Sequence, residues 1–110
     1  MENVADLICR GTHLLMAGKP ADAVEPLREA LRLLPTDGST FCRLAQAYSD
    51  LGRCDEAVQA WEYAILHLDV AERDWRALAF QGLTQSYRDA GRPWRAIALE
   101  EKIGEAEDQA

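Results

Sequence analysis

The chain has 110 residues, of which 48% are hydrophobic, and a formal net charge of −7 at pH 7. A chain of this length is ordinarily a single domain, and this apolar fraction is too high for a disordered chain. Phosphate binding needs a concentration of Lys and Arg, so the acidic balance argues against a nucleic-acid partner. Every apolar run is shorter than the ~20 residues that a membrane-spanning helix requires, which argues against membrane insertion.

The N-terminal segment and the cysteines indicate a compartment. The segment carries Glu2 and Asp6 where a secretory signal peptide would carry basic residues. Cys9, Cys42 and Cys54 are an odd number without CxxC spacing, which fits a reducing compartment better than a disulfide framework. We therefore expect a cytoplasmic protein.

The sequence repeats with a period of 34 residues. Residues of matching size or type at this offset are Leu14 and Tyr48, Gly18 and Gly52, Ala23 and Ala57, Leu27 and Trp61, and Ala30 and Ala64. Tyr48, Gly52 and Ala57 recur 39 residues later as Tyr87, Gly91 and Ala96. This pattern predicts three units, at about 4–37, 38–71 and 77–110, with five extra residues before the third.

Each unit has the pattern of a helix, a tight turn and a second helix. In the second unit, Phe41, Leu44, Ala45 and Tyr48 follow the i, i+3, i+4, i+7 spacing of an amphipathic helix. Gly52 then supplies the residue tolerant of positive φ that ends a helix. The second apolar stripe of this unit comprises Ala57, Trp61, Ala64 and Ile65. Alternation of small and bulky residues of this kind favours one specific packing of neighbouring helices.

Helix starts and bends are predicted at three places. Pro20 suits the first turn of a helix, whereas Pro26 lies deeper and should weaken or bend it. Asp69 with Glu72 resembles a capping pair, so the next helix would begin about five residues early and carry Trp75 on the extension. A loop through Asp74 is the alternative.

The second unit resembles the tetratricopeptide repeat (TPR), a 34-residue helix-turn-helix unit, through Leu44-Ala45, Tyr48, Gly52, Ala57, Trp61 and Ala64. The flanking units match less completely, through residues that include Gly11, Leu14 and Pro35 in the first and Leu83 and Tyr87 in the third. The resemblance implies an all-α, right-handed superhelical array (an α-solenoid) of three TPR units in a single domain over 1–110. One departure is Glu100, which stands where the second unit has Trp61 and leaves the last helix with less bulk.

The resemblance also implies a concave groove, lined by the first helix of each unit, that binds a peptide or a partner helix. The family's groove positions correspond here to Ile8, Thr12, Leu15, Met16, Cys42, Gln46, Ser49, Gln81, Gln85 and Arg88. The groove would be apolar at its first end, suited to an apolar or amphipathic segment, and rich in amides at its other end. The Lys, Arg and Asn set with which relatives clamp a C-terminal carboxylate is missing.

The sequence does not indicate catalysis. It contains no GxSxG, P-loop, HExxH or GxGxxG motif. Cys9 and His13 are spaced i, i+4, but two ligands do not complete a zinc site, and helix packing explains both. We expect no enzyme, no cofactor and no metal.

Three functions remain open at this stage. The favoured one is a non-enzymatic scaffold that binds a protein or peptide in the groove. A second is a small acidic chaperone for one specific client, of the kind found in secretion systems. The third is a structural subunit that self-associates, for example as a homodimer, through Trp94 and Ile97 on the last helix.

Overall fold

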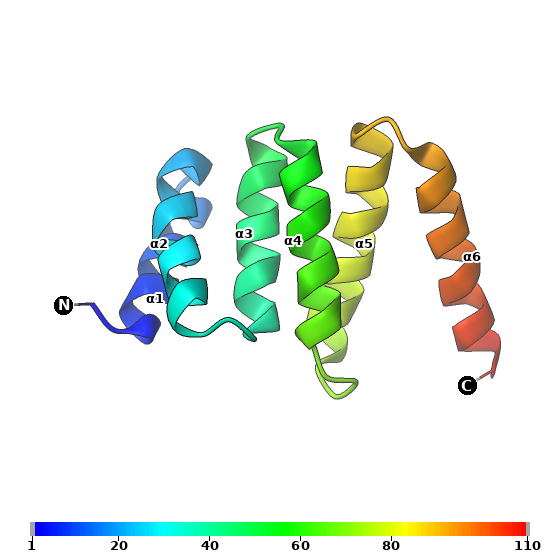
Figure 1. Ribbon diagram of the computed structural model, residues 1–110, viewed down its shortest axis with the longest axis horizontal. Helices are drawn as coiled ribbons and strands as arrows, with labels where there is room; N and C mark the ends of the chain where they lie inside the picture. The colour runs from blue at the N-terminus through cyan, green and yellow to red at the C-terminus, as the bar shows by residue number, and fades with distance from the viewer. Residues whose placement is uncertain (1, 110) are drawn as a thin grey trace.

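The computed structural model describes the backbone of residues 2–109 and the side chains of residues 2–104. This range contains six helices and no strand (Figure 1), which confirms the all-α prediction. The helices are α1 (Val4–Met16), α2 (Pro20–Leu33), α3 (Gly38–Asp50), α4 (Cys54–His67), α5 (Arg73–Asp89) and α6 (Pro93–Gln109). The ends of the predicted domain and of its third repeat, residues 1 and 110, lie outside the described residues.

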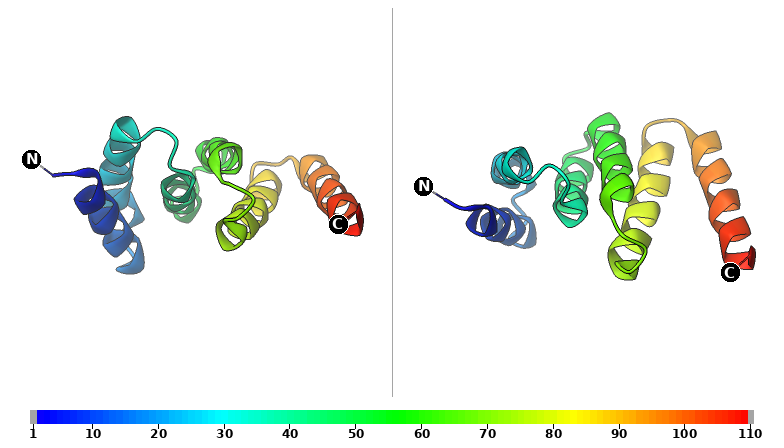
Figure 2. Two further views of the ribbon diagram at one scale, coloured as in Figure 1. Left: turned by 90° about the horizontal axis from the view of Figure 1, so that it is seen from below. Right: turned by 60° about the horizontal axis from the view of Figure 1, so that its bottom comes forward.

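The helices pair into three successive hairpins that form an elongated array. The array measures 47 × 30 × 21 Å, and the two ends of the chain lie at its opposite ends. In the left view of Figure 2 the helices of the first hairpin are seen partly from the side, whereas the later helices are seen nearly end-on. The helix axes therefore turn along the array. Helices adjacent in sequence pack against each other, and α3 also contacts α1 and α5. This is the arrangement of an α-solenoid.

The three hairpin turns have the same backbone structure. Gly18, Gly52 and Gly91 have φ values of 74°, 73° and 77°, a region that residues with a side chain rarely adopt. The residue after each glycine donates its N–H to the carbonyl five residues earlier, over 2.8 Å, 2.9 Å and 2.7 Å. This is the hydrogen bond of a Schellman motif, which satisfies a free carbonyl at the helix end. The prediction that glycine ends the first helix of each unit is confirmed.

Bulky side chains on the second helix of a hairpin pack against small residues on first helices. Leu27 of α2 fills the space beside Gly11 of α1, where an added Cβ would lie 2.6 Å from the leucine side chain. Trp61 of α4 is 1% exposed and packs against Gly82 of α5, where an added Cβ would overlap the indole ring. Trp61 therefore joins the second hairpin to the third, because α5 can approach its ring only at a residue without a side chain.

The start of α5 differs from the predicted capping pair. The helix begins at Arg73 with Glu72 as its N-cap, so the prediction that Asp69 is the cap was wrong. The Glu72 carboxylate does accept the 2.9 Å hydrogen bond from the Asp69 backbone N–H that a capping pair makes, but here the bond closes residues 69–72 into a turn before the helix. The helix still begins early enough to include Trp75, and it has 17 residues where α1 and α3 each have 13. In α2, the helix continues past Pro26 to Leu33.

The last helix is held at fewer places than the others. Within the described residues, α5 is the one helix whose backbone lies close to that of α6, whereas α2 and α4 each contact two helices. Trp94 and Ile97 of α6 are 63% and 54% exposed. None of the helices in the described range combines the length and apolar character needed to cross a membrane.

The contact between Trp61 and Gly82 can be tested by adding one methyl group. Gly82→Ala places a Cβ against the rigid indole ring, and we expect overpacking to lower the free energy of unfolding by about 1–3 kcal/mol. Gly104→Ala is the matched control, because nothing lies within 4 Å of a Cβ at this helical position. It should raise stability by about 0.5–1 kcal/mol through helix propensity. Urea unfolding measures both changes, and equal effects of the two variants would contradict this packing.

Candidate binding site

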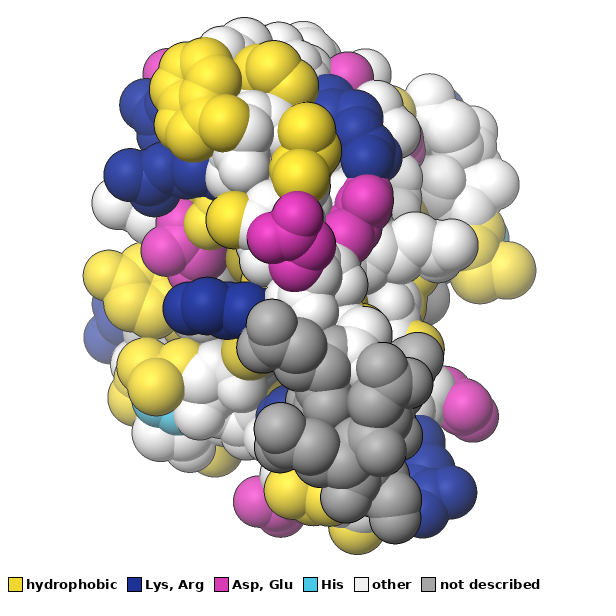
Figure 3. Space-filling view, turned by 90° about the vertical axis from the view of Figure 1, so that its right-hand side faces the viewer, with side chains coloured by type: hydrophobic (Ala, Val, Ile, Leu, Met, Phe, Trp, Pro, Cys, Tyr) yellow, Lys and Arg dark blue, Asp and Glu magenta, His cyan; other side chains and the backbone are white. Residues whose placement is uncertain are grey.

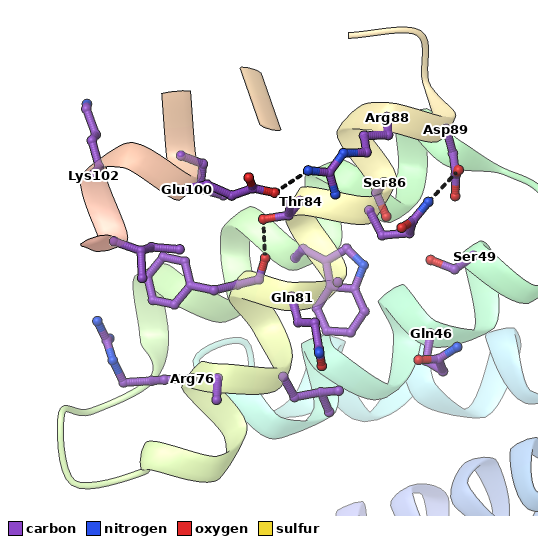
Figure 4. Close-up of a pocket in the computed structure, with 18 residues that line it drawn as sticks. Gln46, Ser49, Arg76, Gln81, Thr84, Ser86, Arg88, Asp89, Glu100 and Lys102 are labelled. Carbon is purple, nitrogen blue, oxygen red and sulfur yellow. Dashed lines mark hydrogen bonds and ion pairs between the residues drawn. The ribbon is translucent and has the colours of Figure 1, made fainter. Parts of the chain in front are cut away.

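The candidate site is a cavity of about 1080 Å³ bounded by α3, α4, α5 and α6, here called the α5 cavity (Figure 4). It brings together five of the ten residues predicted to line the groove. These are Gln46, Ser49, Gln81, Gln85 and Arg88. Its wall is mainly apolar, as binding cavities for peptides and small molecules usually are.

Two glutamines on neighbouring first helices form matching side-chain pairs. Gln46 Nε2 of α3 donates to Asp50 Oδ1 over 2.9 Å, and Gln85 Nε2 of α5 donates to Asp89 Oδ1 over the same distance. Each aspartate thereby fixes one end of its glutamine amide. The carbonyl oxygen and the second N–H of each amide remain for another hydrogen-bond partner. Both glutamines are exposed, so the α5 cavity offers two similarly oriented amides from successive hairpins.

The α6 wall of the α5 cavity contains residues that the prediction of the groove did not include. Leu99 and Ile103 supply apolar surface, and Glu100 forms an ion pair with Arg88 of α5 across the cavity (Figure 4). Both partners of this pair are substantially exposed, so it contributes at most about 1 kcal/mol to stability. The sequence does carry one signal for this wall, because Glu100 stands where the second unit has the bulky apolar Trp61.

The α5 cavity exists because the third hairpin departs from the size pattern of the first two. The buried bulky residue of the second helix is Leu27 in α2 and Trp61 in α4, whereas α6 has the exposed Glu100. Leu27 packs against Gly11, and the residues equivalent to Gly11 at the repeat offsets are Ala45 in α3 and Thr84 in α5. The Thr84 hydroxyl donates to the Phe80 carbonyl over 2.8 Å. Without a large side chain between them, α5 and α6 leave space for another group.

The predicted groove residues of α1 lie apart from the α5 cavity. Ile8, Thr12 and Leu15 are partly buried, and Leu15 packs against the core. Met16 is 84% exposed at the end of the helix. The structure therefore does not gather all ten predicted residues into one cavity.

Cys42 is the one predicted groove residue that is fully covered. It is 1% exposed, and its Sγ lies 3.9 Å from the Trp75 carbonyl oxygen. Trp75 belongs to the N-terminal extension of α5 and also lies beneath the Arg43 guanidinium, 4.7 Å from the ring centre. A partner in the groove does not reach the Cys42 thiol in this structure.

Burial raises the pKa of the Cys42 thiol from 9.0 to about 12, and the carboxylates of Asp37 and Glu72 add to this effect against the opposing charge of Arg43. Because the thiolate is the reactive form, Cys42 should react with iodoacetamide at pH 8 at least about 100-fold more slowly than the exposed Cys9. The raised pKa also stabilises the fold below pH 9, and this contribution is lost between about pH 9 and pH 12. Peptide mapping by mass spectrometry separates the two cysteines, and equal rates would show that Cys42 is accessible.

The other polar side chains of the described residues do not form a metal-binding site. No group of three or more His, Cys, Asp or Glu side chains lies close enough to hold an ion in this part of the chain. The Trp61 indole N–H, in the wall of the α5 cavity, is buried without a hydrogen-bond partner. The structure offers no physical account of this unpaired donor.

Comparison with known proteins supports the fold. The crystal structure of the MamA protein matches this chain with a TM-score of 0.82 over 97% of its residues, at 20% sequence identity. The match covers 56% of the MamA chain, so this sequence spans little more than half of that protein's length. Neither the family models nor the curated proteins provide a match to the sequence. At this identity the likeness shows the fold alone, and the chain has the MamA-like fold of a helical-repeat array.

Proposed function

We propose that this chain is a non-enzymatic protein-interaction module composed of three TPR units, at about 4–37, 38–71 and 77–110. It binds a peptide or a partner helix in the concave groove formed by the first helices. The observation that carries the proposal is that five predicted groove residues, from two successive hairpins, line one cavity of about 1080 Å³. The MamA-like fold supports a role as an interaction scaffold in general.

The chemistry of the α5 cavity supports binding rather than catalysis. Its predicted groove residues contribute amides, a hydroxyl and a guanidinium that is already paired with Glu100. Such groups orient a polypeptide by hydrogen bonding and leave its covalent bonds unchanged. The matched pairs Gln46–Asp50 and Gln85–Asp89 provide fixed amides at successive positions along the groove. An extended peptide presents backbone N–H and C=O groups that suit both glutamines.

A test of the groove selects peptides from a random display library against the full chain and compares their affinities for variants. Gln46→Ala combined with Gln85→Ala should raise the Kd of the selected peptides at least tenfold, because two fixed amides are removed. Gln59→Ala is the control, since Gln59 is also an exposed amide, lies on α4 and does not line the α5 cavity. It should change the Kd less than twofold. An unchanged Kd in the double variant would contradict groove binding.

A further inference from the structure

The first two hairpins show what kind of side chain fills the position that Glu100 holds in the third. At the repeat offsets of 34 and 39 residues, Glu100 of α6 corresponds to Leu27 of α2 and Trp61 of α4. Leu27 and Trp61 are 0% and 1% exposed, whereas Glu100 is exposed. In both earlier hairpins the second helix therefore buries a bulky apolar group at this position, and the third hairpin lacks that group.

The space left between α5 and α6 has apolar walls. This part of the α5 cavity is here called the anchor pocket, and it is lined by Phe80, Thr84, Leu99, Glu100 and Ile103. Phe80, Leu99 and Ile103 are partly buried. The Thr84 hydroxyl already donates to the Phe80 carbonyl over 2.8 Å, so its proton needs no other partner. An apolar side chain placed here would cover apolar surface and would strip water from few unpaired polar groups.

The charged side chains around the anchor pocket have partners of their own. Arg88 forms an ion pair with Glu100. Arg76 lies with its guanidinium 5.5 Å from the centre of the Phe80 ring and donates to the Leu68 carbonyl over 3.1 Å. Because Arg88 and Glu100 are both substantially exposed, their pair can open at little cost when a group enters. Size and apolar character, rather than charge, therefore select the occupant of this pocket.

The anchor pocket adjoins the amide-lined part of the groove. Thr84 directly precedes Gln85, whose amide is fixed by the hydrogen bond to Asp89. Figure 4 shows Gln46 on one side of α5 and Glu100 on the other. A peptide that crosses α5 thus meets both parts of the α5 cavity. Since successive side chains of an extended chain point to opposite faces, its backbone can face the amides while one side chain enters the anchor pocket.

We propose that the anchor pocket binds one bulky apolar side chain, in the size range from leucine to tryptophan, of the peptide that occupies the groove. This side chain takes the place that Leu27 and Trp61 fill in their own hairpins, while Gln46 and Gln85 hold the peptide backbone. Anchors of this kind commonly carry most of the binding energy of an interface. The inference rests on the proposed function and names the residue class that the partner must present.

A different apolar surface lies at the same end of the molecule and must be distinguished from the anchor pocket. The end-on view in Figure 3 shows hydrophobic side chains gathered at the top of this end. The exposed residues of α6 include Trp94 and Ile97, neither of which lines the α5 cavity. A ligand attracted by exposed apolar surface alone would bind there.

The first test uses single blocked amino acids, which bind without the amide-lined groove. The probes are N-acetyl-leucinamide and N-acetyl-tryptophanamide, with N-acetyl-glutaminamide as the control. Titration of the full chain, followed by two-dimensional NMR, should shift the backbone amide signals of Thr84 and Ile103. The apolar probes should have Kd values at least tenfold below that of the control. Failure of both apolar probes to bind more tightly, or shifts confined to Trp94 and Ile97, would overturn the proposal.

Variants that fill the pocket locate the probe. Glu100→Leu restores the residue type of the first hairpin and should weaken binding of N-acetyl-tryptophanamide at least tenfold, because the new side chain occupies the pocket. Glu100→Gln removes the ion pair without filling the pocket and should change the Kd less than threefold. Glu101→Leu is the matched control at a neighbouring exposed residue that does not line the cavity, and it should change the Kd less than twofold. An unchanged Kd in the Glu100→Leu variant would overturn the proposal.

The same variants distinguish this inference from the proposed function. Peptides selected by display against the full chain should share a bulky apolar residue, and its replacement by alanine should raise their Kd at least tenfold. Peptides that are weakened by Gln46→Ala with Gln85→Ala but not by Glu100→Leu would overturn the anchor pocket and leave groove binding intact. The opposite pattern would support the anchor pocket and contradict groove binding.

Discussion

The structure depends on the contact between the Trp61 ring and the backbone of α5 at Gly82. A helix that carries a large flat side chain can be approached closely only where the neighbouring helix has no side chain. This contact fixes the third hairpin on the second, and the contact of Leu27 with Gly11 closes the first hairpin by the same means. The hydrophobic core is one cluster of buried residues that runs along the array from Ala23 of α2 to Ala96 of α6, with bulky-to-small contacts between helices that are close in sequence.

The same constraint explains the candidate site. In the third hairpin the residue equivalent to Trp61 is Glu100, which is too short and too polar to fill the space between α5 and α6. The hairpin consequently retains a cavity, and the Arg88–Glu100 ion pair crosses it. The features that leave the last hairpin less tightly packed therefore also form the cavity at which we propose that a partner binds. Among the described residues, packing contacts are more numerous around α4 than around α6, so we expect local stability to fall toward the last helix.

Local chemistry made much of the fold predictable from the sequence. Gly18, Gly52 and Gly91 marked the turns because positive φ is a property of a single residue, and the 34-residue period revealed the helical pairs. The start of α5 was mispredicted because the hydrogen bond between the Asp69 N–H and the Glu72 carboxylate suits both a helix cap and a closed turn. The coverage of Cys42 by Trp75 was not predictable, since it depends on how far the extended α5 reaches across α3. Glu100 was recognisable in the sequence as a departure from the pattern of the second unit, but the size of the cavity beside it could be known only from the structure.

The central claim is that the array is held firmly through Trp61 and loosely at α6. Residue-resolved amide hydrogen exchange of the full chain tests this claim most directly, because local opening is resisted by the contacts each helix makes. The account predicts that amides of α4 around Trp61 exchange most slowly and that amides of α6 around Glu100 exchange at least tenfold faster. Equal protection of α4 and α6 would contradict it.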